Sequence, residues 1–196
     1  MSVRKTSVIV GILFFVQMIT AMIGTSLIQA FMDGEPNKAA LTAGVLLMMC
    51  SGLAVVGIGL LMYPILKLVN AKLAMWYPIM RVTEFTVSAI CGIYLLTQLQ
   101  VVPNHLLWVY IPTGVGGLIF TYLLFVSKLV PRSIALLGLI GYASLSLGVL
   151  LDLANIVDMN QGMGQLLLAP GGLFEFVFLP IWLIAKGLKL PETRSI

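Results

Sequence analysis

Six long apolar runs take up most of this chain of 196 residues. A helix needs about 17 to 25 mainly apolar residues to cross a hydrocarbon core roughly 30 Å thick, and each run meets this requirement. The runs lack the strict alternation of apolar and polar residues that is typical of membrane-barrel strands. We therefore predict an all-α integral membrane protein with six transmembrane helices, at residues 7–31, 40–66, 73–97, 106–127, 133–152 and 166–185.

The composition favours the same class of protein. Hydrophobic residues make up 60% of the chain and charged residues only 9%, whereas soluble domains average about 45 to 50% apolar and about 25% charged residues. The connections at 68–72 and 129–132 are short, which makes consecutive helices antiparallel neighbours and leaves no room for a soluble domain. We expect residues 1–196 to form a single compact bundle.

The basic residues predict the orientation of the bundle. Nine of the eleven Lys and Arg fall on one side of the six helices, and the positive-inside rule places that side, with both termini, in the cytoplasm. We expect a multi-pass protein of the inner (plasma) membrane. The basic residues are dispersed between the runs, so the net charge of +4 does not predict nucleic-acid binding. The nine are Arg4, Lys5, Lys67, Lys72, Lys128, Arg132, Lys186, Lys189 and Arg194.

Aromatic residues near the ends of the runs are predicted to be interfacial anchors. Four fall near the cytoplasmic ends and three near the outer ends, and we interpret all of them as anchors rather than ligands. They are Tyr63, Trp76, Tyr77 and Trp182 on the first side, and Tyr94, Trp108 and Tyr110 on the second.

Three charged residues, Arg81, Glu84 and Glu175, lie inside the apolar runs. A charge at the bilayer centre costs from about 2.5 to more than about 10 kcal/mol. With a rise of about 1.5 Å per residue, Arg81, Glu84 and Glu175 lie about 13, 18 and 16 Å from the basic residue at the cytoplasmic end of their helix. Arg81 and Glu84 share a helix face because they are three residues apart. We predict a midplane cluster that joins the third and sixth helices.

Two further polar residues reach the same depth, Gln17 at about 18 Å and Tyr142 at about 15 Å. The candidate ligand- or proton-binding set is therefore Arg81, Glu84, Glu175, Gln17 and Tyr142. One guanidinium and two carboxylates leave a formal charge of −1, which a retained proton or a bound cation would neutralise.

Three hypotheses for function stay open at this point. In the first, the cluster binds or transports a proton-coupled, cationic or amine-bearing small ligand in a mid-membrane cavity. In the second, the protein is a structural or regulatory subunit and the cluster is a dry polar lock between helices. In the third, an enzyme acts on a lipid or isoprenoid, with Glu84 as general base.

Helix-breaking and small residues surround the candidate cluster. Pro78 and Pro180 each remove one backbone hydrogen bond from their helix. The Pro170-Gly171-Gly172 segment predicts either a discontinuous helix of the transporter kind or an ordinary helix start. Glycines in the second, fourth and fifth helices allow close helix packing, and the same faces could support a homo-oligomer.

The remaining chemistry is limited. His105 is the only histidine, and Cys50 and Cys91 are expected to be packing residues. No nucleophile set can be assembled, so we predict no catalytic residue, metal or cofactor. The expected partners are the lipid bilayer and a small-molecule ligand or proton.

Three stretches carry a family resemblance. They are LMYPILKLVNAKLAMWYPIMRVTEF at 61–85, TYLLFVSKLVPRSIALLGLIGYAS at 121–144 and LAPGGLFEFVFLPIWLIAKGL at 168–188. Together they resemble the prokaryotic membrane family catalogued as domain of unknown function 4386. The resemblance implies a six-helix membrane protein of bacteria or archaea and implies no activity.

Overall fold

The computed structural model describes residues 2–34, 37–159 and 162–189. All regular structure in these residues is helical, and six segments are long and apolar enough to span a membrane, which confirms the predicted fold class. The first five are single helices: α1 (Val3–Met32), α2 (Lys38–Leu66), α3 (Ala71–Gln98), α4 (His105–Ser127) and α5 (Arg132–Leu153).

The sixth span, Gly164–Ala185, is not one regular helix. It contains the end of α6 (Gly162–Leu166), then α7 (Ala169–Leu173), a π-helical turn η1 (Phe174–Phe178) and α8 (Leu179–Ala185). The helix is interrupted at residues 167–168, just before the Pro-Gly-Gly segment. Pro170, Gly171 and Gly172 themselves lie inside α7, with Pro170 in its first turn, so the sixth span is interrupted before this segment and not at it.

Local sequence explains where the helices begin. The side chain of Asn37 accepts a hydrogen bond from the amide of Ala40 at 3.0 Å, and Asn70 caps Leu73 in the same way at 3.0 Å. Asparagine is a preferred N-cap because its side-chain oxygen satisfies an amide that has no partner within the helix. These caps fix the short connections on either side of α2.

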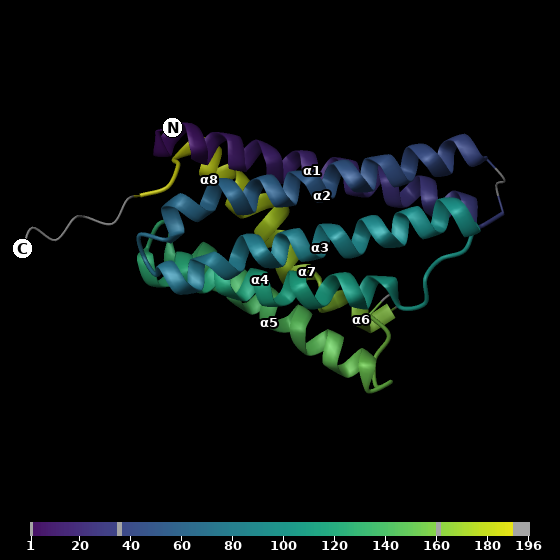
Figure 1. The fold of residues 1–196 in the computed structure, drawn as a ribbon. Coiled ribbons are helices and arrows are strands. Elements are labelled where there is room, and N and C mark those ends of the chain that lie inside the picture. The colour runs from purple at the N-terminus through teal and green to yellow at the C-terminus, as the bar shows by residue number, and fades with distance from the viewer. Residues whose placement is uncertain (1, 35–36, 160–161, 190–196) are drawn as a thin grey trace, which may run out of the picture.

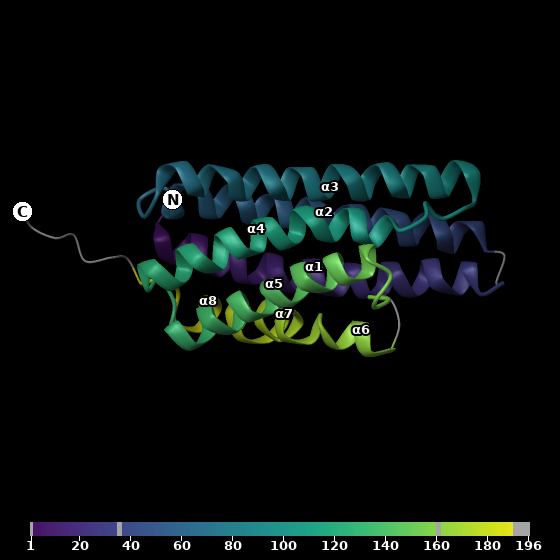
Figure 2. The ribbon, with the colours of Figure 1, turned by 90° about the horizontal axis from the view of Figure 1, so that it is seen from below.

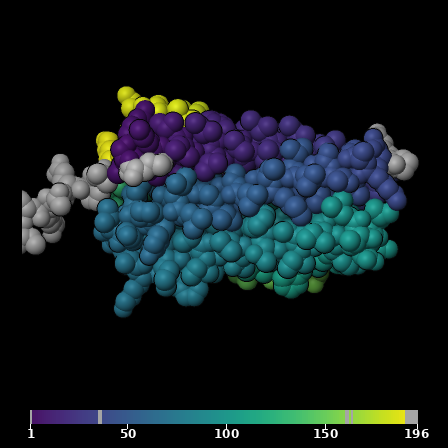
Figure 3. Space-filling view, turned by 45° about the horizontal axis from the view of Figure 1, so that its top comes forward, coloured from purple at the N-terminus to yellow at the C-terminus, as the bar shows by residue number. Residues whose placement is uncertain are grey.

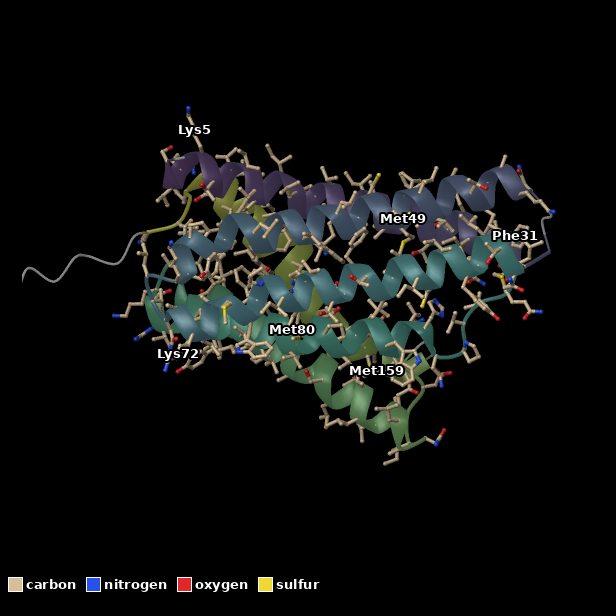
Figure 4. All side chains as sticks on the ribbon, in the orientation of Figure 1. Lys5, Phe31, Met49, Lys72, Met80 and Met159 are labelled. Atoms are coloured by element: carbon tan, nitrogen blue, oxygen red, sulfur yellow. The ribbon has the colours of Figure 1, made fainter. Side chains whose placement is uncertain are left out.

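The six spans form a closed ring. Each of α1 to α4 packs against the next helix in the chain, and the sixth span packs between α5 and α1 (Figures 1 and 2). The N-terminus and the end of α8 lie together at one end, which we name the basic end (Figure 1). Lys5 and Lys72 mark it in Figure 4. At the opposite end lie the last residues of α1, α3 and α5 and the first residues of α2, α4 and α6.

Arg4 closes the ring at the basic end. Its guanidinium donates to the carbonyls of Leu183 at 3.2 Å, Ile184 at 2.7 Å and Ala185 at 3.3 Å. These carbonyls belong to the last turn of α8, where the helix itself supplies no partner. Cation donors are favourable there because the C-terminal end of a helix is electronegative.

Glycines inside the ring allow the helices to approach closely. A Cβ atom on Gly141 would lie 2.5 Å from the Cα of Gly171, so α5 and α7 meet backbone to backbone. A Cβ atom on Gly117 would overlap the ring of Tyr142. Gly117 and Gly141 are buried within the chain. An oligomer formed through glycine faces would therefore have to use other positions, and the oligomeric state stays a prediction.

One predicted anchor is wrong. Tyr77 is 1% exposed and stacks on Phe120, with ring centroids 4.6 Å apart and planes at 7°. It lies one turn before Arg81 on the same face of α3, so it turns toward the ring interior. Its neighbour Trp76 is 49% exposed and remains at the surface.

Candidate functional site

Arg81 and Glu84 form a close ion pair in the middle of α3. Nη1 of Arg81 donates to Oε2 of Glu84 at 2.7 Å. Arg81 is 2% exposed and the Glu84 side chain 13% exposed. The spacing of three residues on one helix brings the two groups together without help from another span.

Tyr142 of α5 connects Arg81 to the sixth span. Its hydroxyl lies 3.2 Å from Nη2 of Arg81 and donates to Oε1 of Glu175. Arg81 Nη2 is 3.8 Å from the same carboxylate oxygen. A single hydroxyl therefore accepts from the guanidinium and donates to the second carboxylate.

Gln17 brings α1 into the same network. Its side-chain amide donates to Oε2 of Glu175 at 3.5 Å, and its backbone carbonyl accepts from Ser51 of α2 at 3.1 Å. The structure thus brings all five residues singled out in the sequence into one hydrogen-bonded network. We name Gln17, Arg81, Glu84, Tyr142 and Glu175 the polar cluster.

The two carboxylates have different surroundings. Glu84 accepts a direct hydrogen bond from the guanidinium, whereas Glu175 receives its hydrogen bonds from the neutral groups of Tyr142 and Gln17. Glu175 also lies in η1, the π-helical turn. Such turns are rare and frequently occur at functional sites. Pro180 follows this turn and crowds the carbonyl four residues before it, which gives a local reason for the wider winding.

The guanidinium is also enclosed by aromatic rings. Its Cζ atom lies 5.2 Å from the ring centroid of Tyr77 and 6.0 Å from that of Tyr142. Cation–π contacts of this length stabilise a charge that has lost its water. Nε of Arg81 is buried and has no hydrogen-bond acceptor among the described residues. A buried donor without an acceptor is unusual and calls for a physical explanation.

Sequence reasoning missed three neighbours of the polar cluster. Ser51 holds Gln17, Tyr77 covers Arg81, and Thr113 of α4 lies close to the Glu84 carboxyl. Ser51 and Thr113 are ordinary small polar residues in apolar runs, so their positions carry no distinctive signal. Tyr77 could have been found, because it lies four residues before Arg81.

The family model described as "Domain of unknown function (DUF4386)" matches the chain in two stretches, residues 9–105 and 93–187. The chain belongs to this family. The resemblance of the three sequence stretches is thereby confirmed, and most of this DUF4386 protein is covered by the match. No curated protein and no solved structure matches it.

This DUF4386 protein also contains a cavity, between α1, α2, α3 and α4 in the half of the bundle away from the basic end. None of the five residues of the polar cluster lines it. The binding hypothesis predicts a cavity at the cluster itself, whereas this one begins further along α3, at Ser88.

The charged and polar groups of the cluster determine which ligands it can bind. Among the described residues, no group of three or more His, Cys, Asp or Glu side chains could hold a metal ion. The polar cluster combines one guanidinium, two carboxylates, one phenol and one amide. Such a set can hold a proton or a monovalent cation, and it can also connect α1, α3, α5 and the sixth span mechanically.

Proposed function

We propose that this protein binds a small cationic or amine-bearing ligand, or carries it across the membrane, in exchange for a proton at the polar cluster. The observation that carries the proposal is the charge of the cluster: Arg81 is the one guanidinium opposite Glu84 and Glu175. A net charge of −1 in the interior of a membrane protein is costly unless a proton or a cation neutralises it.

Two features of the geometry support the proposal. Nε of Arg81 is a buried donor without an acceptor among the described residues, so a polar group of a ligand or a water molecule would satisfy it. Glu175 lies on the π-helical turn of the sixth span, and π-helical turns frequently occur at functional sites. The same span is interrupted at residues 167–168, and discontinuous spans are typical of transporter binding sites.

We further infer that the basic end faces the cytoplasm of a prokaryotic cell, because the nine basic residues on that side obey the positive-inside rule. The opposite end, with Asp33, Asp152 and Asp158, then faces outward. A cation arriving from outside would meet the acidic end first.

One observation favours a second candidate, a structural subunit in which the polar cluster is a lock. Both Nη groups of Arg81 have partners, and each carboxylate accepts at least one hydrogen bond from the protein. Interhelical hydrogen bonds in membranes average only about 0.6 kcal/mol, so a lock of this kind would fix the register of the helices more than it would add stability.

The two candidates differ in their response to pH. If a cation displaces one proton from the polar cluster, its apparent affinity rises with pH by up to about tenfold per pH unit, because binding and deprotonation are linked. Benzyltrimethylammonium is a suitable probe, since its own charge does not change with pH. Its effect on the thermal unfolding midpoint of the purified protein is measured from acidic to alkaline pH.

The test variants are Glu84→Gln and Glu175→Gln, and the control is Gln98→Glu, which adds a carboxylate at the exposed end of α3, outside the cluster and the cavity. We expect the wild type and Gln98→Glu to show the pH-dependent stabilisation, and both cluster variants to lose it. If the cluster variants are less stable but respond to pH and probe like the wild type, the lock is correct and the binding proposal is wrong.

A further inference from the structure

The cavity between α1 and α4 is mostly apolar and has a volume of about 210 Å³. Figure 3 shows α1, α2 and α3 side by side along the molecule. Met48, Met49 and Leu95 supply apolar wall, and Ser88 and His105 add polar atoms. Figure 4 places Met49 in the space between α2 and α3. Methionine side chains adapt their shape readily, which suits a wall that accepts varied ligands.

The volume limits what the cavity can hold. An apolar cavity of about 150 Å³ in another protein accepts benzene, so 210 Å³ suits a body of one ring with a short substituent. A larger amphiphile would have to leave part of its body outside. The cavity therefore selects small ligands.

The polar cluster begins one helical turn below this cavity. Ser88 lines the cavity, and Glu84 lies four residues earlier on the same face of α3, which is about 6 Å along the axis. On α4, Val109 lies in the cavity wall, and Thr113, four residues later, donates its hydroxyl to the carbonyl of Val109 at 2.8 Å and lies close to the Glu84 carboxyl. Two adjacent helices thus lead from the cavity to the same carboxylate.

The other end of the cavity also has acidic character. Gln29 lines the cavity, and its side-chain amide donates to Asp33 at 2.9 Å. Asp33 is the residue that ends α1 at the opposite end of the bundle. A negative charge near an apolar cavity raises the local concentration of cations. Both ends of the cavity are therefore complementary to a positive charge.

We propose that this cavity holds the apolar body of a small monovalent organic cation, one ring or a short branched chain in size, with its ammonium group directed toward Glu84. The proposal rests on the proposed function, because it names the ligand class and the place where the ligand enters. In this arrangement Glu84 contacts the cation, and Arg81 and Tyr142 hold the carboxylates in position.

The chain carries its own reporter for this site. Cys91 lines the cavity, whereas Cys50 is exposed on the surface of α2. In the full-length Cys50→Ser protein, the rate at which N-ethylmaleimide modifies Cys91 reports access to the cavity. Benzyltrimethylammonium at ten times its dissociation constant is expected to slow this modification about tenfold, because only about a tenth of the protein is then free. Neopentylbenzene, its neutral isostere, is expected to protect less.

Two variants, with one control, test where the apolar body and the charged group of the probe bind. Val109→Phe fills the cavity, and it is expected to abolish protection by either probe. The matched control is Val115→Phe, which changes a residue of α4 that is 44% exposed. In this control the probes should protect Cys91 as they do in the parent protein. Glu84→Gln should weaken protection by the cation about tenfold, the size expected for the loss of one charge-assisted contact, and leave protection by the neutral probe unchanged.

Several outcomes would overturn the inference. Equal protection by both probes, unaffected by Glu84→Gln, would show an apolar cavity that does not recognise charge. Equal protection in Val109→Phe and Val115→Phe would place the probe outside the cavity. If no probe protects Cys91 but the pH-linked stabilisation at the polar cluster persists, this inference fails and the proposed function stands. If protection is observed without pH linkage, the cavity binds the cation but proton exchange at the cluster is wrong.

Discussion

At the scale of single residues, the polar cluster is asymmetric. Glu84 shares a hydrogen bond with the guanidinium of Arg81, whereas Glu175 is bound by the hydroxyl of Tyr142 and the amide of Gln17. The two carboxylates are equally buried, with side chains 13% exposed. Their different partners, and not their burial, should therefore decide how the protein responds when each charge is removed.

Glu84→Gln is expected to lower the free energy of unfolding by about 3 to 5 kcal/mol, because it leaves the buried Arg81 charge without its close partner. Glu175→Gln is expected to change it by less than about 1 kcal/mol, since the amide oxygen of glutamine still accepts from Tyr142 and the net charge falls to zero. Thermal unfolding in the same detergent measures both. A larger loss for Glu175→Gln would contradict the assignment of the close ion pair.

Tyr142→Phe tests the hydroxyl that joins α3 to the sixth span. The ring keeps its edge-on contact with Phe174, whose centroid is 6.2 Å away, so only the hydrogen bonds are lost. We expect a loss of about 0.6 to 1.7 kcal/mol, which is the range for interhelical hydrogen bonds in membranes. Tyr122→Phe, at a position 49% exposed on α4, is the matched control and should have no effect on the unfolding midpoint.

At the scale of elements, the sequence predicts the regular helices and not the irregular one. The spans α1 to α5 follow from hydropathy and length, which depend on composition alone. The interruption at 167–168 and the π-helical turn around Glu175 depend on where Gly171 meets Gly141 and on how the turn before Pro180 packs. The contact between Gly171 and Gly141 is tertiary, so no local pattern specifies it, whereas Pro180 is a local signal for an irregular turn but does not specify its form.

The same limit applies to side-chain direction. The depth of Arg81, Glu84, Glu175, Gln17 and Tyr142 was predictable from the rise of a helix, and all five meet at one level. The sequence indicates only weakly which face of α3 points into the bundle. Apolar residues lie on all sides of this helix, and the bilayer can accommodate any of these faces. Tyr77 was misplaced at the interface for this reason.

Gly141→Leu tests the backbone contact between α5 and α7. A Cβ atom there would lie 2.5 Å from Cα of Gly171, and backbone atoms cannot move aside as a flexible side chain can. We expect a loss of about 1 to 3 kcal/mol, the cost typical of overpacking, or failure to assemble a monodisperse protein. Ala143→Leu, on the exposed side of the same helix, adds a side chain of the same size and should be tolerated. Equal loss in the two variants would mean that α5 does not pack through Gly141.

At the scale of the whole molecule, the ring explains why four separate spans contribute to one site. The sixth span returns to α1, and Arg4 fastens its last turn to the beginning of the chain. The residues from α1, α3, α5 and the sixth span that point inward therefore converge near the middle of the bundle. An open row of helices would leave Gln17 and Glu175 far apart.

The ring also fixes the relation between the two ends of the chain, because an even number of spans places both termini on one side. The positive-inside rule then predicts that this side is the cytoplasm. Two exposed residues can test this orientation. Leu68 lies between α2 and α3 at the basic end and is 66% exposed, and Ile156 follows α5 at the opposite end and is 69% exposed. In a chain with Cys50→Ser and Cys91→Ala, we expect Ile156→Cys to react with a membrane-impermeant maleimide in intact cells. Leu68→Cys should react only after the membrane is opened. The reverse pattern would place the acidic end in the cytoplasm, and a cation from outside would then meet the basic end instead of the cavity.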